Sequence, residues 1–154
     1  MSFGSLSANA IQALNKAASI GGFYHDTGEG GISPYHLEHG GDLVWEIGSG
    51  YFGCRDSEGR FDEGLFAENA RQPTVKMTEI KLSQGAKPGH GGLLPAAKVS
   101  EEIAAVRHVP VGQDCVSPRV MSDNHLGRCR QPPWPVGLDG RRACPSGGQP
   151  HRPD

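Results

Sequence analysis

The sequence contains no run of apolar residues that approaches the roughly 18 needed to span a bilayer. Only 36% of its 154 residues are hydrophobic, and 6% are aromatic. With a formal net charge of −2, the chain lacks the basic field that attracts nucleic acid or anionic lipid. It also lacks the charged start and apolar core of a secretory signal. These absences predict a soluble, cytoplasmic protein with neither nucleic-acid nor membrane partners.

Metal and nucleotide motifs are also missing. No CxxC pair is present, so free thiols are predicted at Cys54, Cys115, Cys129 and Cys144. Neither GxGxxG nor GxxxxGK[ST] occurs, which disfavours Rossmann and P-loop sites. His36 and His39 are three residues apart, but spacing supplies no third ligand. We interpret them as part of a solvated loop and predict no metal site.

The first 118 residues show alternating helix and strand patterns. Helices are predicted over residues 8–20, 61–71 and 101–107, and strands over residues 43–47, 75–82 and 109–116. Ile11, Leu14 and Ala18 would form the apolar face of the first helix, and Trp45 and Phe52 would lie in the core. Strands that alternate with helices indicate βαβ units, and so an α/β fold with a parallel sheet.

From residue 119 onward the composition changes to arginine, proline and glycine without periodicity. Such a segment cannot bury enough apolar surface to offset the entropy of ordering it. The sequence therefore predicts one domain over residues 1–118 and an irregular tail over residues 119–154. An alternative is that translation has left the native frame near Ser117, since GC-rich DNA read out of frame encodes such a mixture.

Three glycine-rich clusters, over residues 27–31, 48–50 and 84–92, follow a short segment at residues 23–25 and the strands predicted over residues 43–47 and 75–82. In a parallel α/β barrel the loops after the strands lie on one face and build the active site. Glycine allows backbone N–H groups to approach a ligand closely. The first cluster carries Glu29 and the third carries Lys87, so these charged side chains are candidate functional residues.

The motifs MSFGSLS, DTGEGG, SGYFGC, QGAKPGHGG and LLPAAKV occur in this order. Together they resemble the FMN-binding domain of glutamate synthase, and especially the stand-alone FMN-binding glutamate synthase-like proteins. The resemblance continues to CVSP at residues 115–118 and then stops. It implies a partial (β/α)8 TIM barrel, of which this chain supplies the first three to four strand–helix units, followed by the irregular tail.

The resemblance also implies an FMN-dependent oxidoreductase that forms glutamate reductively from 2-oxoglutarate and ammonia nitrogen. An electron-donor protein or reductase subunit is an implied partner. The full-length family carries a 3Fe–4S cluster, whose ligands lie downstream of the matched part. Because a complete barrel needs about 250 residues, we expect a fragment that is inactive alone. The alternatives are a non-catalytic remnant and a different FMN-dependent barrel oxidoreductase.

Site roles follow from the matched motifs. The implied cofactor contacts come from Met1, Ser2, Thr27 and Gln84. Met1 and Ser2 would lie against the flavin ring, and Gln84 would hydrogen-bond its pyrimidine edge. Glu29 would face the substrate as a catalytic residue. Lys87 would bind a 2-oxoglutarate carboxylate or polarise its carbonyl.

The sequence departs from the family pattern at three positions. Tyr51 replaces the arginine of SGRFGV that would bind a substrate carboxylate, and Arg55 is the predicted substitute. His90 replaces a glutamate and Leu93 replaces a glutamine in the third glycine-rich cluster. These three differences bear on the prediction of 2-oxoglutarate as the substrate more than on the prediction of FMN as the cofactor.

Overall fold

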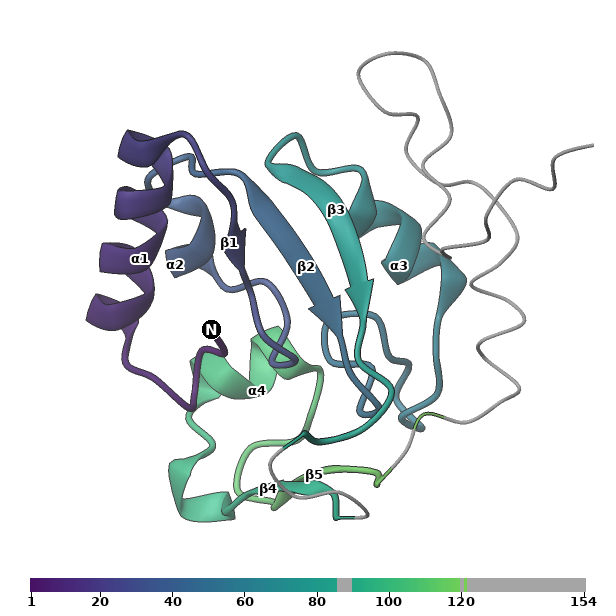
Figure 1. Ribbon diagram of the computed structural model, residues 1–154. Helices are drawn as coiled ribbons and strands as arrows, with labels where there is room; N and C mark the ends of the chain where they lie inside the picture. The colour runs from purple at the N-terminus through teal and green to yellow at the C-terminus, as the bar shows by residue number, and fades with distance from the viewer. Residues whose placement is uncertain (86–89, 120, 122–154) are drawn as a thin grey trace, which may run out of the picture.

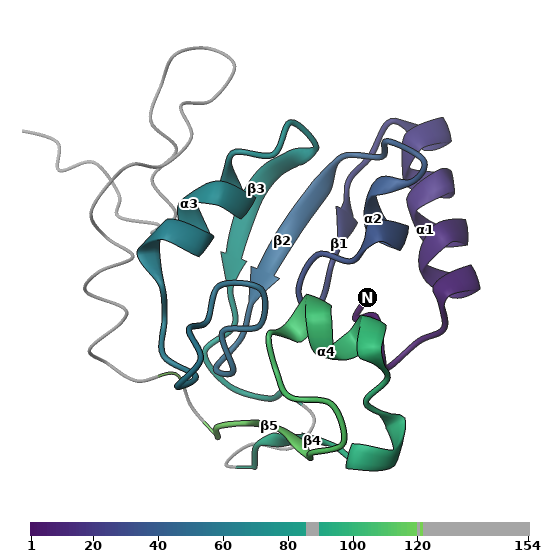
Figure 2. The same ribbon diagram turned by 180° about the vertical axis from the view of Figure 1, so that it is seen from behind.

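The computed structural model describes residues 1–85, 90–119 and 121. Its central sheet has three parallel strands in the order β1 (His25–Asp26), β2 (Leu43–Ile47) and β3 (Val75–Ile80). Helix α1 (Ala8–Gly21) precedes β1, α2 (Pro34–Leu37) connects β1 to β2, and α3 (Glu63–Ala70) connects β2 to β3. Figures 1 and 2 show α2 and α3 on the same face of the sheet. The predicted α/β class with a parallel sheet is confirmed.

The remaining elements gather near the carboxyl ends of the three strands (Figure 1). They are β4 (Gly92–Leu94), the 3-10 turn η1 (Ala96–Lys98), α4 (Glu101–Arg107) and β5 (Cys115–Ser117). Strands β4 and β5 pair in antiparallel fashion. The strand predicted over residues 109–116 is wrong for most of its length, because Pro110 has no N–H to donate and Gly112 turns the chain with a φ of +75°.

Helix α1 forms as predicted, and the predicted burial of Ile11 and Ala18 is confirmed, whereas that of Leu14 is wrong. Ser7 caps it by accepting a hydrogen bond from the Ala10 N–H at 3.3 Å, and Gly22 ends it in the left-handed region. Leu14, predicted to be buried, is exposed, whereas Asn15 is fully buried. The Asn15 amide binds both the N–H and the carbonyl of Gly41, each at 3.3 Å. These two bonds give the backbone N–H and carbonyl of Gly41, which lies in a loop, the hydrogen-bond partners that a neighbouring strand would otherwise supply.

The helix and strand predicted over residues 61–71 and 75–82 are confirmed with shorter bounds, as α3 and β3. Asp62 is the N-cap of α3, since its carboxylate accepts the Leu65 N–H at 2.8 Å. Phe61 lies outside the helix because it forms an isolated bridge with Arg55.

Two apolar clusters hold the fold. The first lies between the sheet and α3 and contains Trp45, Ile47, Tyr51, Cys54, Phe66, Ala70, Val75 and Met121. The second joins the first residues of the chain, α1 and α4, and contains Phe3, Ile11, Phe52, Val99, Ile103, Ala104 and Cys115. The prediction that Trp45 and Phe52 lie in the core is confirmed.

Cys54 and Cys115 are buried and form no disulfide among the described residues, in agreement with the prediction of thiols. Cys129 and Cys144 lie outside the described residues, as does nearly all of the predicted tail. Among the helices that the structure describes, none has both the length and the apolar character of a membrane span.

Candidate functional site

The glycine-rich segments after β1, β2 and β3 converge at one edge of the sheet. Because the strands are parallel, their carboxyl ends face the same way (Figure 1). Residues 27–31 follow β1, residues 48–50 follow β2, and residues 81–85 follow β3. The predicted gathering of these loops is therefore confirmed for the described residues.

Glu29 lies at the centre of this gathering. Gln84 Nε2 donates to Glu29 Oε1 at 3.0 Å and to Oε2 at 2.7 Å. Lys81 Nζ lies 3.3 Å from Glu29 Oε2. The predicted catalytic Glu29 and cofactor-binding Gln84 are thus direct hydrogen-bond partners, although they lie 55 residues apart in the sequence.

Glycine is required where the neighbouring loop meets Glu29. A Cβ on Gly48 would lie 2.9 Å from both Cβ and Oε2 of Glu29. A Cβ on Gly92 would lie 3.3 Å from Glu29 Oε1. The absent side chains therefore make room for this carboxylate between two backbone segments.

Lys81 is a site residue that the sequence interpretation missed. Its Nζ bridges Glu29 and Glu46, with Glu46 Oε1 at 3.6 Å. Burial opposes the charge of Lys81, but the carboxylates of Glu29 and Glu46 outweigh that effect and raise its pKa. A usable signal is its position near the end of the strand predicted over residues 75–82, because ligand sites in parallel sheets lie at the carboxyl ends of the strands.

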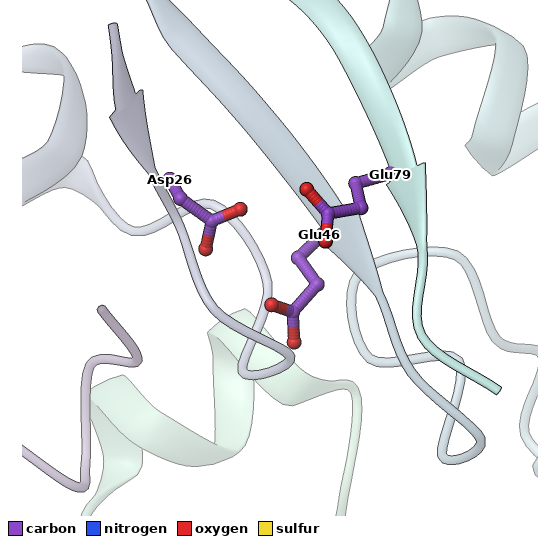
Figure 3. A group of neighbouring side chains, drawn as sticks. All are labelled: Asp26, Glu46 and Glu79. Carbon is purple, nitrogen blue, oxygen red and sulfur yellow. The ribbon is translucent and has the colours of Figure 1, made fainter. Parts of the chain in front are cut away.

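A group of three carboxylates lies beside Lys81, on the sheet itself. Asp26, Glu46 and Glu79 offer oxygens within 4.8 Å of one another, one from each strand (Figure 3). Burial raises the pKa of Glu46, and the neighbouring Asp26 raises it further, while Lys81 acts in the opposite direction. The described site therefore carries more negative than positive charge.

The predicted cofactor contacts Met1, Ser2 and Thr27 lie around the turn after β1. Ser2 Oγ accepts the Gly30 N–H at 3.3 Å, and the Met1 carbonyl contacts His36 Nε2 at 2.9 Å. Thr27 is fully buried; its Oγ1 accepts the Glu46 N–H and donates to the Gly28 carbonyl, both at 3.0 Å. Within the described residues, Thr27 therefore joins β1 to β2 through its side chain.

Arg55 is oriented toward its own loop. Its Nη1 donates to the Gly50 carbonyl at 3.3 Å, and its guanidinium lies 5.7 Å from the centre of the Phe52 ring. No described hydrogen bond or ion pair joins Arg55 to Glu29. Tyr51 is buried in the core, with its ring 5.9 Å from that of Phe61, and adopts a left-handed φ of +51°.

Lys87 lies outside the described residues, so its predicted roles stay predictions. Of the other two departures from the family pattern, His90 is exposed, and Leu93 on β4 is 65% exposed.

The interpretation of His36 as part of a solvated loop is wrong. Ser33 and Pro34 begin a helical turn, α2, that places the His36 ring in the interior with no exposed surface. His36 Nδ1 accepts the Ser33 N–H at 3.1 Å and contacts Ser33 Oγ at 2.8 Å. Its ring centre lies 5.3 Å from that of the buried His25. His36 therefore joins α2 to the start of the chain.

Comparison with known proteins gives a consistent assignment. Residues 1–125 match the family model described as the conserved region in glutamate synthase. The chain is 45% identical over 119 residues to the glutamate synthase large subunit-like protein YerD of Bacillus subtilis, covering 77% of this chain and 22% of that protein. It is 42% identical over 118 residues to the archaeal-type glutamate synthase [NADPH] of Thermotoga maritima, covering 77% and 21% respectively.

A more distant relative, the glutamate synthase large subunit-like protein of Rhizobium meliloti, is 31% identical over 134 residues, which cover 87% of this chain and 25% of the relative. The chain thus spans about a fifth to a quarter of the length of these relatives. The predicted resemblance is confirmed, and the matched region carries the convergent loops around Glu29. The chain belongs to the glutamate synthase family.

Proposed function

We propose that this chain is part of an FMN-dependent oxidoreductase that forms glutamate reductively from 2-oxoglutarate and ammonia nitrogen. The observation that carries the proposal is the direct contact among Glu29, Lys81 and Gln84 at the carboxyl ends of three parallel strands. Barrel enzymes build their sites at this edge. We infer that the described strands form the first part of a (β/α)8 barrel.

The residues present fit a flavin. The Gln84 amide carries both a donor and an acceptor, which complements the alternating carbonyl and N–H groups of a pyrimidine edge. The backbone turns tightly at Gly28, where φ is +65°, and approaches Ser2 closely. Gln84, Ser2 and the Met1 backbone would therefore hold FMN, which would supply a hydride once reduced by the electron donor.

The charged side chains would act on the substrate. Lys81, like an ordinary lysine, is an ammonium near neutrality, and its raised pKa is consistent with that state, so it can bind a carboxylate or polarise a carbonyl. Glu29 can accept a hydrogen bond from a substrate nitrogen or hold its proton. A substrate that hydrogen-bonds to Glu29 would compete with Gln84, because the Gln84 amide donates to both carboxylate oxygens.

The charge balance indicates that the chain is incomplete as a catalyst. In the described site Lys81 pairs with Glu29 and Glu46, the Met1 ammonium lies 4.0 Å from Asp26, and Glu79 adds a further carboxylate beside Asp26 and Glu46. Four carboxylates thus outnumber two ammonium groups among these described residues. A dicarboxylate substrate needs further cations, because like charges repel it. Lys87 is the predicted source within this chain, and the parts of the relatives beyond it would supply the rest. We therefore infer that the chain alone is inactive.

A flavin titration tests the proposed cofactor. Purified chain added to FMN is expected to quench flavin fluorescence saturably. Gln84→Ala is expected to raise the Kd for FMN about tenfold, because one or two hydrogen bonds are lost. The matched control is Gln12→Ala. Gln12 also donates to a glutamate, Glu38, but this pair joins α1 to the end of α2.

Equal affinities for wild type and Gln84→Ala would contradict the assigned role of Gln84. If the wild-type chain does not quench at high concentration, the cofactor proposal fails for this chain, while its family membership stands.

A further inference from the structure

Arg107, the last residue of α4, is a buried cation with no carboxylate partner among the described residues. Its side chain is 6% exposed, and none of the ion pairs among the described residues includes it. Its Nε is buried and has no hydrogen-bond partner in the described part of the chain. Burying an unpaired charge is costly, and apolar replacements of buried charges often stabilise a protein. Stability alone is therefore a poor reason for an arginine here.

The contacts that Arg107 does make come from distant parts of the chain. Nη2 donates to the Phe3 carbonyl at 3.1 Å, across 104 residues of sequence. The guanidinium lies 5.1 Å from the centre of the Phe52 ring, and Nη1 is 3.7 Å from Cys115 Sγ. The face of the Phe52 ring offsets part of the free energy that removing the Arg107 guanidinium from water costs. One side chain thus connects the chain start, the loop after β2, and β5.

The same guanidinium also lies against the glycine turn after β1. A Cβ on Gly4 would lie 3.1 Å from Nη2, and a Cβ on Gly30 would lie 3.3 Å from it. Gly30 in turn donates its N–H to Ser2 Oγ at 3.3 Å. Figures 1 and 2 both show the start of the chain beside α4. The Arg107 guanidinium therefore contacts residues 2–4 and residues 28–31 at the place where these two segments meet.

We propose that Arg107 is a positioning residue that clamps residues 2–4 onto residues 28–31, so that the two segments form one preorganised wall of the flavin site. The inference rests on the proposed function, because these segments carry Ser2 and Glu29. A planar guanidinium suits this task, since it donates in fixed directions and stacks on an aromatic ring at the same time. A lysine can donate to the Phe3 carbonyl but cannot reproduce the whole contact.

Hydrogen exchange of the full 154-residue chain tests the clamp without any cofactor. In Arg107→Met we expect amides in residues 2–6 and 28–31 to exchange at least about tenfold faster, while those of β2 and β3 keep their wild-type rates. Arg107→Lys is expected to restore part of the protection. Unchanged exchange in both segments, or an equal increase throughout the sheet, would overturn the proposal.

A second variant tests the same contact in case Arg107→Met does not fold. Gly30→Ala would place a Cβ 3.2 Å from the Phe3 carbonyl oxygen and 3.3 Å from Arg107 Nη2, and it leaves the arginine in place. A smaller loss of protection in the same residues is expected, because Phe3, Ser2 or Arg107 must shift by a few tenths of an ångström to admit the Cβ. Wild-type protection in Gly30→Ala would contradict a tightly clamped contact.

The flavin titration then separates this inference from the proposed function. If the wild-type chain binds FMN, Arg107→Met is expected to raise the Kd for FMN about tenfold, and Arg107→Lys is expected to raise it less. Faster local exchange with unchanged FMN affinity would overturn the link between the clamp and the flavin site. If wild type does not bind FMN, the proposed function fails, whereas the exchange data still decide whether Arg107 holds the two segments together.

Discussion

Trp45→Ala is expected to lower the free energy of unfolding by about 3–5 kcal/mol, the cost of emptying a large aromatic site in a packed core. Trp45 has no exposed surface and occupies the middle of β2. Its ring stacks on Phe66 of α3 with the centroids 5.6 Å apart. Because a domain is stable by only about 5–15 kcal/mol, the variant should lose most of its folded population in mild denaturant.

Urea unfolding followed by far-ultraviolet circular dichroism measures this effect, since Trp134 complicates tryptophan fluorescence. The control is Trp45→Phe. The Trp45 Nε1–H is buried without a hydrogen-bond partner, so phenylalanine removes an unsatisfied donor while keeping an aromatic ring. We expect it to cost less than about 1.5 kcal/mol. Equal, small losses for both variants would show that packing between the sheet and α3 does not limit stability.

Acidification should destabilise the chain through His36, by up to about 3 kcal/mol. Burial lowers the pKa of His36 from 6.5 to about 4. Between pH 6.5 and about 4, His36 is protonated in the unfolded chain but neutral in the folded chain. The free energy of unfolding therefore falls as the pH falls through this window. The magnitude follows from about 1.4 kcal/mol per pKa unit. Burial also lowers the pKa of His25, which acts in the same direction.

The hydrogen bonds of His36 explain why its neutral form is required. Nδ1 accepts the Ser33 N–H at 3.1 Å, so the proton of the neutral ring belongs on Nε2, which donates to the Met1 carbonyl at 2.9 Å. Protonating Nδ1 would remove the acceptor for Ser33. Acid should therefore loosen the start of the chain, which carries two predicted flavin contacts.

His36→Gln tests this account because glutamine does not titrate. The variant should be less stable than wild type at neutral pH, but its unfolding free energy should fall less between pH 6.5 and 4. His39→Gln, three residues further on and outside α2, is the control and should keep the wild-type slope. Parallel pH profiles for wild type and His36→Gln would rule out His36 as the source of the acid sensitivity.

Much of the local structure could be predicted from the sequence, because its signals act within a few residues. Ser7 and Ser100 mark the starts of α1 and α4, since each hydroxyl accepts a backbone N–H of the first turn. Apolar and β-branched runs mark β2 and β3. The order of the glycine-rich motifs indicated the family, and the family match supports it.

The errors arose where a distant segment decided the outcome. Asn15, rather than Leu14, faces inward because the loop at Gly41 needs hydrogen-bond partners. His36 is buried because the chain start covers α2, a contact between residues 35 positions apart. Helical periodicity and local polarity do not encode such contacts.

The candidate site divides in the same way. The sequence alone determined that Glu29 and Gln84 follow strands, because strand ends and glycine turns are local features. Only the tertiary structure decided that they bind each other, that Lys81 joins them, and that Arg55 points to its own loop. The physical reason is that the pairing of parallel strands, and the packing of Arg107 against Phe3, bring together groups that no sequence spacing relates.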